Sequence, residues 1–434
     1  MKNSQVPGLL YAYYGDDFTG STDVLEALGL NGVPAVLFTH PPSESELAAF
    51  PNCRAIGIAG ESRSRDPEWM TKNLPRVYAR MRELGAPVNH YKVCSTFDSA
   101  PQVGSIGRAM ELGRTAFKAE YVPVMVGAPH LGRSVVFGNL FAAEDGVVYR
   151  IDRHPSMREH PVTAMSEADL RLHLSRQTRM KMGLVDMSSF QSGRAGQRLQ
   201  SELAGGAKAI VFDGCEDAML EETARLLWER AIERPVFAVG SSGLTYGLLG
   251  HWRRKGLIGT VPQARRPDAA DRVLVLSGSC SPVTARQIQR ARQQEFAVLH
   301  LKGHEPWGLE TRKALEALSR GHSVVLYTAL GPQPMDGEHG EAFSTALGDR
   351  LRELLLVSGV RRIVVAGGDT STHAVKQLGL AALTFAAPLS PGAPLCLGHA
   401  PGSPLDGLEL VLKGGQIGSE TFFSQVREGR TSQP

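Results

Sequence analysis

The sequence predicts an α/β fold made of two α/β domains, with mainly parallel sheets and an interdomain cleft. Short apolar runs rich in β-branched residues alternate with helical stretches along the 434-residue chain. Because these runs are apolar on both faces and are separated by helical crossovers, they indicate parallel strands covered by helices on both sides. The alternation breaks over residues 253–271 and then restarts, which predicts a boundary between two domains.

The first predicted domain covers residues 1–252 and begins with an apolar run that leads into a helix. Its candidate strands are the short apolar runs Leu9–Tyr14, Ala35–Phe38, Ala55–Ala59, Tyr91–Cys94, Val122–Val126, Met182–Val185, Ala209–Phe212 and Val236–Val239. Its clearest candidate helices have apolar residues at helical spacing and are Pro67–Leu84, Val103–Leu112 and Asp217–Glu233. A helical pattern also starts at Val24, soon after the first strand.

A basic, proline-containing stretch joins the two predicted domains. Residues 253–271 show no hydrophobic periodicity, so we interpret them as a linker. The second domain, residues 272–434, resumes the alternation. Its candidate strands are Val273–Leu276, Val298–Leu301, Val324–Tyr327 and Arg362–Ala366. Its candidate helices are Thr284–Gln294, Leu309–Leu318, Ala342–Val357 and Thr372–Leu378.

The composition argues against several classes of protein. A net charge of +3 is too small to indicate nucleic acid or a membrane surface as the main partner. No apolar run approaches the length of a membrane span, and no leader with a charged and an apolar region opens the chain. The five scattered cysteines form no C-x-x-C pair, which argues against a disulfide framework and a zinc site. We therefore expect a cytoplasmic protein that binds small molecules, and we assign no metal ligands.

The most informative motif is Tyr14-Gly-Asp-Asp-Phe-Thr-Gly-Ser-Thr-Asp23, where the first strand runs into a helix. Ligands of open α/β sheets bind at the carboxyl ends of strands, beside the amide donors of helix starts. Three carboxylates, Asp16, Asp17 and Asp23, gather at this junction. One can cap the helix and Asp23 can be a surface residue, but one cap accounts for only one carboxylate. Asp16 and Asp17 are therefore the candidate catalytic residues, and which of them acts stays open.

Further polar residues follow other strands of the first domain. Carboxylates suit sugar hydroxyls, whereas Lys, Arg and Ser suit a carboxylate, so together they fit a polyhydroxylated acid. Arg63 can also be a solvated surface residue, as arginine often is. The candidate substrate-binding residues are Arg63, Lys92, Ser95, Thr96, Asp98 and Arg133.

The second domain contains three glycine-rich turns after predicted strands. Glycine lets backbone amides approach an anion, and helix N-termini add a favourable dipole, so these turns suit phosphate groups. Each turn alone can be glycine-rich for steric reasons, but three in one domain favour a nucleotide site. The pattern is neither a P-loop nor a dinucleotide fingerprint. The candidate nucleotide-binding residues are Ser277, Ser279, Ser281, Gly367, Gly368, Asp369, Thr370, Gly414 and Gly415.

One other segment carries histidines, His154 and His160, beside two prolines. Because proline interrupts a regular helix, this spacing does not place both imidazoles on one helix face. No second set of metal ligands accompanies them. We therefore interpret the segment as a loop that packs over the substrate.

Seven short motifs follow one another in a fixed order and together span nearly the whole chain. They are Asp16-Asp-Phe-Thr-Gly-Ser-Thr-Asp23, Lys92-Val-Cys-Ser-Thr-Phe-Asp-Ser99, Gly132-Arg133, His160-Pro-Val-Thr163, Ser241-Ser-Gly-Leu244, Ser277-Gly-Ser-Cys-Ser281 and Gly367-Gly-Asp-Thr370. This set resembles the four-carbon acid sugar kinases, and within them the 3-oxo-tetronate kinase branch most. The chain departs from the family pattern at Asp369, where Glu is common, at Ala164, where Pro is common, and at Gly414, where Ser is common.

The resemblance implies a kinase with an N-terminal acid-sugar domain and a C-terminal nucleotide domain, using ATP and Mg²⁺. Its implied reaction phosphorylates the terminal hydroxyl of a four-carbon acid sugar of the 3-oxo-tetronate, threonate or erythronate type. Ala164 lies in a substrate-side loop, so a branched acid such as 3-oxo-isoapionate is the alternative. Asp16 or Asp17 would orient the attacking hydroxyl, and domain closure would exclude water. A homodimer is one of the assemblies that we consider for such a kinase.

Two other classes remain as alternatives. An NAD-dependent dehydrogenase of sugar acids would need a dinucleotide fingerprint with an acidic residue about 20 positions later, and the sequence has none. A solute-binding protein with two α/β lobes is usually exported, and no leader is evident.

Overall fold

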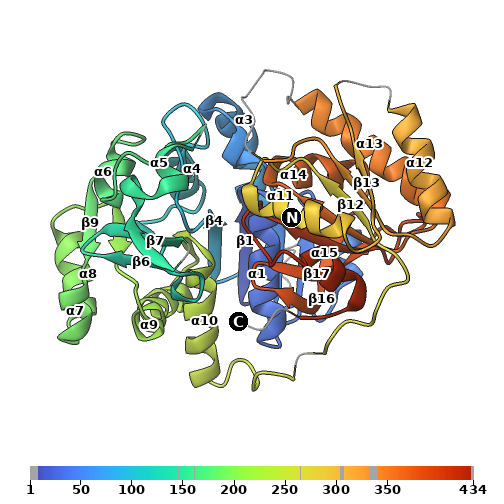
Figure 1. Cartoon of the computed structure of the whole chain (residues 1–434). Coiled ribbons are helices and arrows are strands. Elements are labelled where there is room, and N and C mark those ends of the chain that lie inside the picture. The colour runs from blue at the N-terminus through green and yellow to red at the C-terminus, as the bar shows by residue number, and fades with distance from the viewer. Residues whose placement is uncertain are drawn as a thin grey trace. The chain divides into compact units, whose positions relative to one another are not determined.

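The computed structural model describes residues 8–431, apart from 145, 161, 264, 304–306, 332–340 and the side chains of 341 and 369. The chain divides into two compact units (Figure 1). Unit 1 consists of Met1–Asp16, Asn31–Pro34 and Pro41–Val261, and unit 2 of Asp17–Leu30, Ala35–His40 and Pro262–Pro434. The prediction of an α/β fold with mainly parallel strands is confirmed.

Unit 1 is built around a sheet of parallel strands. Its strands are β1 (Tyr11–Gly15), β3 (Ala55–Ala59), β4 (Val88–Lys92), β5 (Val122–Met125), β9 (Met182–Val185), β10 (Ala209–Phe212) and β11 (Val236–Gly240). They lie in the order β3-β1-β4-β11-β5-β10-β9. Its helices are α2 (Glu44–Ala48), α3 (Pro67–Leu84), α4 (Ile106–Ala116), α5 (Pro155–Arg158), α6 (Leu170–Ser175), α7 (Met187–Gln191), α8 (Ala195–Ala204), α9 (Asp217–Glu233) and α10 (Ser242–Arg254).

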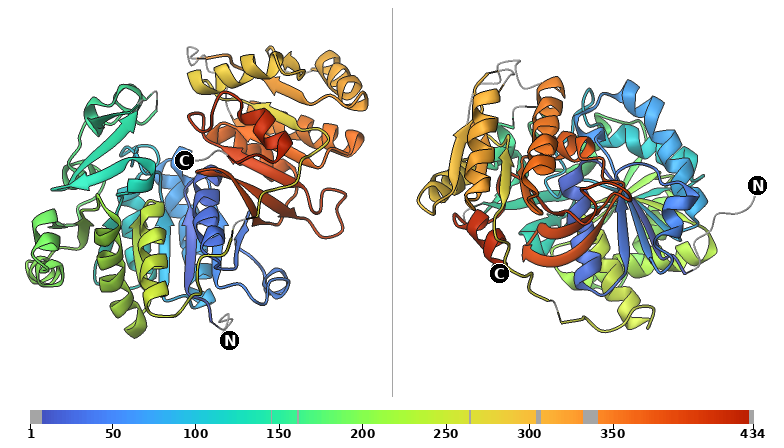
Figure 2. Two further views of the ribbon diagram at one scale, coloured as in Figure 1. Left: turned by 60° about the horizontal axis from the view of Figure 1, so that its bottom comes forward. Right: turned by 90° about the vertical axis from the view of Figure 1, so that its right-hand side faces the viewer.

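A small antiparallel sheet is added to unit 1, and the sequence did not lead us to expect it. It consists of β6 (Arg133–Val136), β7 (Asn139–Glu144) and β8 (Val147–Arg150), in the order β6-β7-β8. Figure 2 shows it as the teal strands at the upper left of its left panel. These strands are largely half-buried or exposed, so they lack the fully apolar runs by which the main strands were recognised.

Unit 2 contains a mixed sheet. Its strands are β2 (Ala35–Phe38), β12 (Leu274–Ser277), β13 (Ala297–His300), β14 (Val324–Tyr327), β15 (Arg362–Ala366), β16 (Ala382–Ser390), β17 (Ala393–His399) and β18 (Glu409–Lys413). They lie in the order β13-β14-β12-β15-β18-β17-β16-β2; pairs from β13 to β18 are parallel and pairs beyond β18 antiparallel. Its helices are α1 (Phe18–Leu30), α11 (Pro282–Arg292), α12 (Gly308–Ser319), α13 (Glu341–Ser358), α14 (Gly368–Gln377) and α15 (Phe422–Glu428).

An N-terminal segment of the chain folds with unit 2. Helix α1 contacts β16, β17, β18 and α14, and β2 pairs with β16 through Phe38 and Ala382. The buried carboxyl group of Glu26 on α1 accepts a hydrogen bond of 2.7 Å from the Gly392 amide between β16 and β17. The boundary between the two units therefore crosses the chain between Asp16 and Asp17 as well as after β11 and α10.

Local signals explain where the predicted elements agree with the structure and where they differ. Helix α3 has the predicted bounds, because Asp66 caps its start, Pro67 takes its first position and Gly85 ends it with a φ of +78°. The predicted helix Val103–Leu112 instead begins at Ile106, after Ser105 caps it. The predicted strand Tyr91–Cys94 has the wrong bounds, since β4 ends at Lys92.

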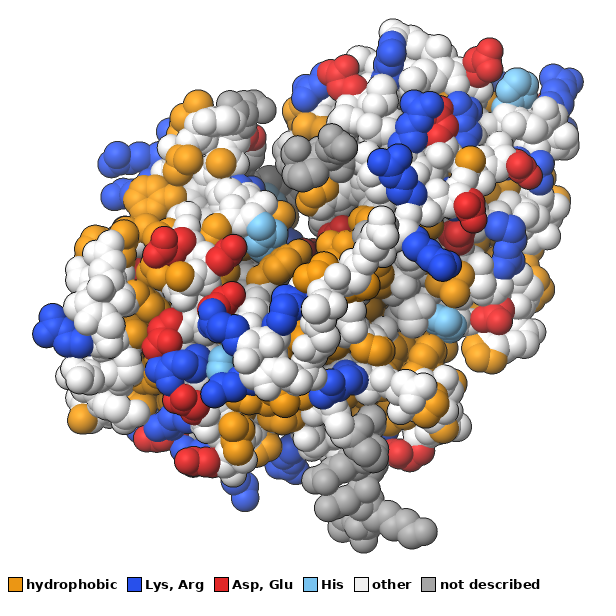
Figure 3. Space-filling view, turned by 90° about the horizontal axis from the view of Figure 1, so that it is seen from below, with side chains coloured by type: hydrophobic (Ala, Val, Ile, Leu, Met, Phe, Trp, Pro, Cys, Tyr) orange, Lys and Arg blue, Asp and Glu red, His pale blue; other side chains and the backbone are white. Residues whose placement is uncertain are grey.

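In the part of the chain that the structure describes, no helix is both long and apolar enough to cross a membrane. On the face drawn in Figure 3, acidic and basic side chains are interspersed, and neither sign gathers into a large patch. This distribution agrees with the small net charge of +3.

Candidate functional site

The strand register of unit 1 brings three polar loops to one edge of its sheet. Gly15 at the end of β1 lies opposite Ala59 of β3 and Lys92 of β4. Lys92 in turn lies opposite Gly240 of β11. The loops that follow β1, β3 and β4 therefore start side by side, at the edge where ligands of parallel α/β sheets bind.

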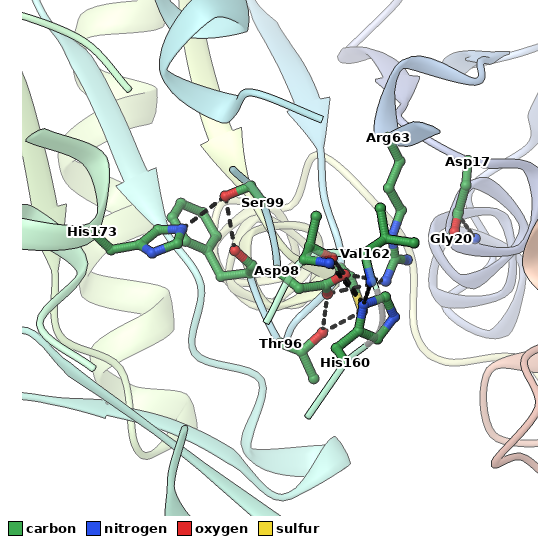
Figure 4. A network of polar contacts seen from close by, with 12 residues as sticks. Asp17, Gly20, Arg63, Thr96, Asp98, Ser99, His160, Val162 and His173 are labelled. Carbon is green, nitrogen blue, oxygen red and sulfur yellow. Dashed lines mark hydrogen bonds and ion pairs between the residues drawn. The ribbon is translucent and has the colours of Figure 1, made fainter. Parts of the chain in front are cut away.

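Asp98 is the centre of a polar network in these loops (Figure 4). Its Oδ2 accepts a hydrogen bond of 2.7 Å from Arg63 Nη2, and its Oδ1 accepts one of 2.5 Å from Thr96 Oγ1. Burial on its own would raise the pKa of Asp98, but Arg63 and Thr96 outweigh it and lower the pKa to about 2. Asp98 is therefore ionised at neutral pH and fixes the Arg63 guanidinium.

The loop that carries His160 joins the same network. Thr163 Oγ1 donates to Asp98 Oδ2 at 3.1 Å, and the Thr163 amide donates to His160 Nδ1 at 3.0 Å. The two residues belong to a motif of the resemblance but were not among the candidate site residues. The expectation of a loop beside the substrate residues agrees with these contacts. Proline does not exclude helix here altogether, because Pro155 occupies the first position of the one-turn helix α5.

A buried set of hydrogen bonds supports the loop of Asp98 from behind. Ser99 Oγ lies 2.8 Å from His173 Nε2 and accepts a hydrogen bond of 2.9 Å from Gln177 Nε2. Phe97, between Thr96 and Asp98, has a φ of +58°, a strained value for a non-glycine residue. Ser99 Oγ also donates to the Phe97 carbonyl at 3.1 Å, and these three hydrogen bonds help to hold the strained turn in one conformation.

Asp16 is fixed by its backbone between two candidate substrate residues. Its amide donates to the Lys92 carbonyl at 3.0 Å, and its carbonyl accepts from the Arg63 amide at 3.1 Å. The side chain is 5% exposed. Burial, with a smaller contribution from the charge of Asp16, raises the pKa of Tyr14 to about 12. The Asp16 carboxylate thus lies close to Tyr14 at the end of β1.

The remaining candidate substrate residues differ in their surroundings. Lys92 is buried at the end of β4, and Ser95 is half-buried in the following loop. Arg133 donates through Nη1 to the carbonyls of Leu131 and Ala143, at 2.9 and 3.0 Å. Among the described residues, its buried Nε has no hydrogen-bond partner, and no carboxylate lies within ion-pair distance of its guanidinium group. Burial lowers the pKa of Arg133, and Cys94 of the Lys92 loop and Glu144 of β7 partly oppose this shift electrostatically.

The register of unit 2 brings the three glycine-rich turns together. Ser277 at the end of β12 lies opposite Ala366 of β15, and Ala366 lies opposite Lys413 of β18. The turns that begin at Ser277, Gly367 and Gly414 are therefore neighbours at the carboxyl ends of parallel strands.

Close approaches between these turns leave no room for a side chain at two of their glycines, Gly278 and Gly415. A Cβ on Gly278 would lie 2.1 Å from Thr370 Oγ1, and one on Gly415 would lie 2.7 Å from Ser279 Oγ. Gly367 has a φ of +118°, in the region that favours glycine. The Ser277 hydroxyl is fully buried and has no described hydrogen-bond partner. Narrow glycine turns with an unsatisfied hydroxyl fit the phosphate groups of a nucleotide.

Helix α11 starts at the first of these turns. Ser281 is its N-cap and accepts a hydrogen bond of 3.2 Å from the Val283 amide. The Thr284 hydroxyl in its first turn donates to the Gly415 carbonyl at 2.8 Å. The positive end of the helix dipole therefore lies at the turns, where it favours an anion.

Asp17 faces the second glycine turn. Its Oδ1 accepts a hydrogen bond from the Gly20 amide at 2.5 Å, so it caps α1. Its Oδ2 lies 3.8 Å from the position of a Cβ on Gly368. The side chain of Asp369, the other acidic candidate in this turn, lies outside the described residues.

Lys413 was not among the candidate site residues. It ends β18 with a side chain that is 0% exposed, and its Nζ donates to Thr284 Oγ1 at 3.0 Å. A lysine in the last position of a buried apolar strand, directly before Gly-Gly, was the available sequence signal. Within the described residues, no group of three or more His, Cys, Asp or Glu side chains is arranged to hold a metal ion.

Two family descriptions match the chain. Residues 11–248 match the sugar-binding N-terminal domain, and residues 274–423 match the nucleotide-binding C-terminal domain. A 3-oxo-isoapionate kinase from Paraburkholderia graminis is 45% identical, over 98% of this chain and 95% of the relative. A 3-oxo-tetronate kinase from Pseudomonas savastanoi pv. phaseolicola is 30% identical, over 95% of each chain.

Solved structures share the fold. A Salmonella typhimurium protein described as a putative tRNA synthase is 26% identical with a TM-score of 0.74, over 96% of this chain and 98% of that one. A Haemophilus influenzae protein of the family DUF1537 is 24% identical with a TM-score of 0.70, over 96% and 99%. The resemblance inferred from the ordered motifs is confirmed, as is the expectation of a kinase. The chain belongs to the four-carbon acid sugar kinase family.

Proposed function

We propose that this protein transfers the terminal phosphoryl group of ATP to a hydroxyl group of a small 3-oxo sugar acid. The observation that carries the proposal is the set of three glycine turns aligned by the register of β12, β15 and β18. The kinases related to this chain supply the reaction class. Phosphoryl transfer needs positioning and charge stabilisation more than covalent help from the protein, and both fit these turns.

The acid's carboxylate is proposed to bind at Arg133, with Lys92 as the second cation. Arg63 Nη2 already contacts both oxygens of Asp98, at 3.0 and 2.7 Å. Arg133 has no described carboxylate within ion-pair distance and keeps a buried Nε without a hydrogen-bond partner. A ligand carboxylate would satisfy that donor, because guanidinium groups pair well with carboxylates. Arg63, Thr96 and Asp98, which are held in place by their mutual hydrogen bonds, would then orient the hydroxyl groups of the acid.

Two acids are supported as substrates. The 45% relative is named for 3-oxo-isoapionate, and the relatives named for 3-oxo-tetronate are 28–30% identical. Ala164 follows Thr163, which donates to Asp98, so a smaller residue stands beside the proposed acid site than in the common family pattern. We therefore rank 3-oxo-isoapionate first, and 3-oxo-tetronate second.

The two adjacent carboxylates are given separate roles. Asp17 caps α1 with one oxygen and faces the Gly368 turn with the other, so it belongs to the nucleotide side. Asp16, held between Lys92 and Arg63 by backbone hydrogen bonds, is the proposed acceptor of the proton from the attacking hydroxyl.

The glycine turns and the start of α11 would hold the phosphates, and Asp17 is the described carboxylate that would face their Mg²⁺. Magnesium in such sites is bound largely by phosphates and water, with one or two carboxylates, which agrees with the lack of a described three-ligand cluster. When bound, Mg²⁺ supplies neutralisation of phosphate charge.

An ADP-release assay tests the function. Purified protein with ATP and Mg²⁺ is incubated with 3-oxo-isoapionate, 3-oxo-tetronate, threonate or erythronate, and kcat/KM is compared. We expect turnover with at least one acid and the highest value with 3-oxo-isoapionate. Arg133→Met should reduce kcat/KM for the acid at least tenfold with little change in the KM for ATP, whereas Arg234→Met, on an exposed ion pair, should do neither. No ADP release with any acid would contradict the proposal, and reduction of NAD by the acids would favour a dehydrogenase.

A cytoplasmic location is part of the proposal. All five cysteines are free, although Cys53 and Cys396 are buried, which agrees with a reducing compartment. A homodimer is proposed as the assembly and is tested by light scattering of the purified protein.

A further inference from the structure

Lys413 is a buried cation that the proposed transfer does not use. It is the last residue of β18, and its side chain is 0% exposed. Its Nζ donates to Thr284 Oγ1 at 3.0 Å and lies 5.9 Å from the centre of the Phe422 ring. Both contacts are to uncharged groups. An ammonium group without a counter-ion is costly to bury, so this site favours the neutral amine.

No described charged group on the surrounding helices and strands neutralises a positive charge on Lys413. No described carboxylate lies within 4.0 Å of its Nζ, and none contributes electrostatically to its pKa. The charged residues of α11, α15, β15, β17, β18 and the loop before α15 contact one another or neutral groups instead. These contacts are Arg286 with Glu420, Arg290 with Gln293, Arg292 with Tyr327, Arg362 with Glu409, Arg427 and Arg430 with Glu428, and His399 with Thr384. Helices α1 and α14 also pack against β18, but none of the described charged residues in or directly before them contributes electrostatically to the pKa of Lys413; these are Asp17, Asp23, Glu26, His373 and Lys376.

The position of Lys413 connects it to all three glycine turns. Its carbonyl accepts a hydrogen bond of 3.0 Å from the Gly367 amide, and Gly414 and Gly415 follow it in the chain. Its hydrogen-bond partner Thr284 lies in the first turn of α11 and donates to the Gly415 carbonyl at 2.8 Å. The positive end of the α11 dipole disfavours the charged form of Lys413, whereas a phosphate bound at the turns would favour it.

We propose that Lys413 takes up a proton from solvent when nucleotide phosphates bind to the three turns, so that nucleotide binding is coupled to protonation. The neutral amine becomes an ammonium group, and its new charge stabilises the bound phosphates. This inference rests on the proposed nucleotide site, and it adds that the protonation of Lys413 controls how tightly that site binds phosphates. Burial lowers the pKa of Lys413 to about 7, so the amine of the free protein is mostly neutral at pH 8.

Isothermal titration calorimetry with Mg·ADP at pH 8 tests the proposal. A phosphate's second ionisation lies near pH 6, so the ligand itself is almost fully ionised under these conditions. Titrations in HEPES and in Tris, which differ in ionisation enthalpy, give the number of protons taken up. We expect an uptake approaching about one proton per nucleotide. The dissociation constant should rise with pH above 7, by up to about tenfold per pH unit.

Two variants separate the role of Lys413 from a merely structural one. Lys413→Arg keeps a permanent charge, so it should bind Mg·ADP without proton uptake and with a flatter pH dependence. Lys413→Met fits the buried site without a charge, so it should bind at least tenfold more weakly at pH 7 and also without uptake. Circular dichroism and melting curves establish that both variants are folded.

The outcomes distinguish the inference from the function on which it rests. Failure of the wild type to bind Mg·ADP would overturn the nucleotide site and the inference together. Binding without proton uptake would leave the nucleotide site intact and overturn the inference. Uptake that persists in Lys413→Arg would also overturn it, because another group would then be the proton acceptor.

Discussion

Replacement of Asp98 by asparagine tests how much the charged polar network around Asp98 contributes to the stability of unit 1. Asp98 is 4% exposed and accepts hydrogen bonds from Arg63, Thr96 and Thr163. Asparagine keeps the shape of the side chain but loses the charge that pairs with Arg63. The expected effects are a loss of stability and a higher KM for the acid, because the network orients the loops beside the proposed substrate.

The size of the stability effect follows from the lowered pKa of Asp98. The difference between the ordinary value of 3.8 and about 2, at about 1.36 kcal/mol for each pKa unit, corresponds to roughly 2 kcal/mol at neutral pH. For a unit of 150–250 residues, this predicts a decrease in melting temperature of about 4–8 °C. Since the folded-state pKa is lowered, the stabilisation is present above pH 3.8 and is lost as the pH falls toward 2.

Melting curves of wild type and Asp98→Asn at pH 7 and pH 3 measure this effect, and the difference should narrow at the lower pH. Glu120→Gln is the matched control, because Glu120 pairs with Arg230 and Arg234 but its side chain is 43% exposed. Such an exposed pair contributes at most about 1 kcal/mol. The reasoning is refuted if Asp98→Asn melts within about 1 °C of the control at pH 7, or if the difference is the same at pH 3.

Three further predictions concern other parts of the chain. Asp16→Asn should lower kcat at least about a hundredfold with both KM values retained. Asp17→Asn should instead raise the KM for ATP and lower the melting temperature. If steady-state kinetics show a near-normal kcat for both variants, a carboxylate base is not part of the mechanism. Gly278→Ala should raise the KM for ATP at least tenfold, because its Cβ would lie 2.1 Å from Thr370 Oγ1, while Gly308→Ala, with open space around it, should leave that KM unchanged. Burial raises the pKa of Glu26 to about 8, so the wild type should lose stability as the pH rises from about 5 to 8. Melting curves of Glu26→Gln should not show this loss of stability. An equal loss in the variant would contradict the argument that burial of Glu26 causes it.

The main strands were predictable because their signal is local. The strand Ala55–Ala59 is buried and apolar throughout, and Arg362–Ala366 is apolar after its first residue; both were found with their observed bounds. Helix α9 was also found with its observed bounds, Asp217–Glu233, by its periodicity. The hairpin of β16 and β17 was not predicted. Pro388 interrupts its alternation, and the structure accommodates it at a shift in the strand register.

The candidate site was predictable in its chemistry but not in its pairings. The sequence indicated that Arg63 and Asp98 belong near one site, yet it gave no sign that they neutralise each other across a separation of 35 residues. Arg133 and Arg63 were equivalent candidates in the sequence. The structure shows that Arg63 pairs with Asp98, whereas Arg133 has no ion pair among the described residues. Lys413 was overlooked because burial, which suppresses its charge, depends on α11 and α15.

The sequence by itself determined the class of fold, the three glycine-rich turns and the family, because glycine turns, strand ends and ordered motifs are local features of the chain. Only the tertiary structure decided which of two adjacent carboxylates caps a helix, which cation is already paired, and that α1 and β2 fold with unit 2. These properties depend on hydrogen bonds and burial between residues that are distant in sequence. Their energies are set by the surroundings of each group, which the chain acquires only when it folds.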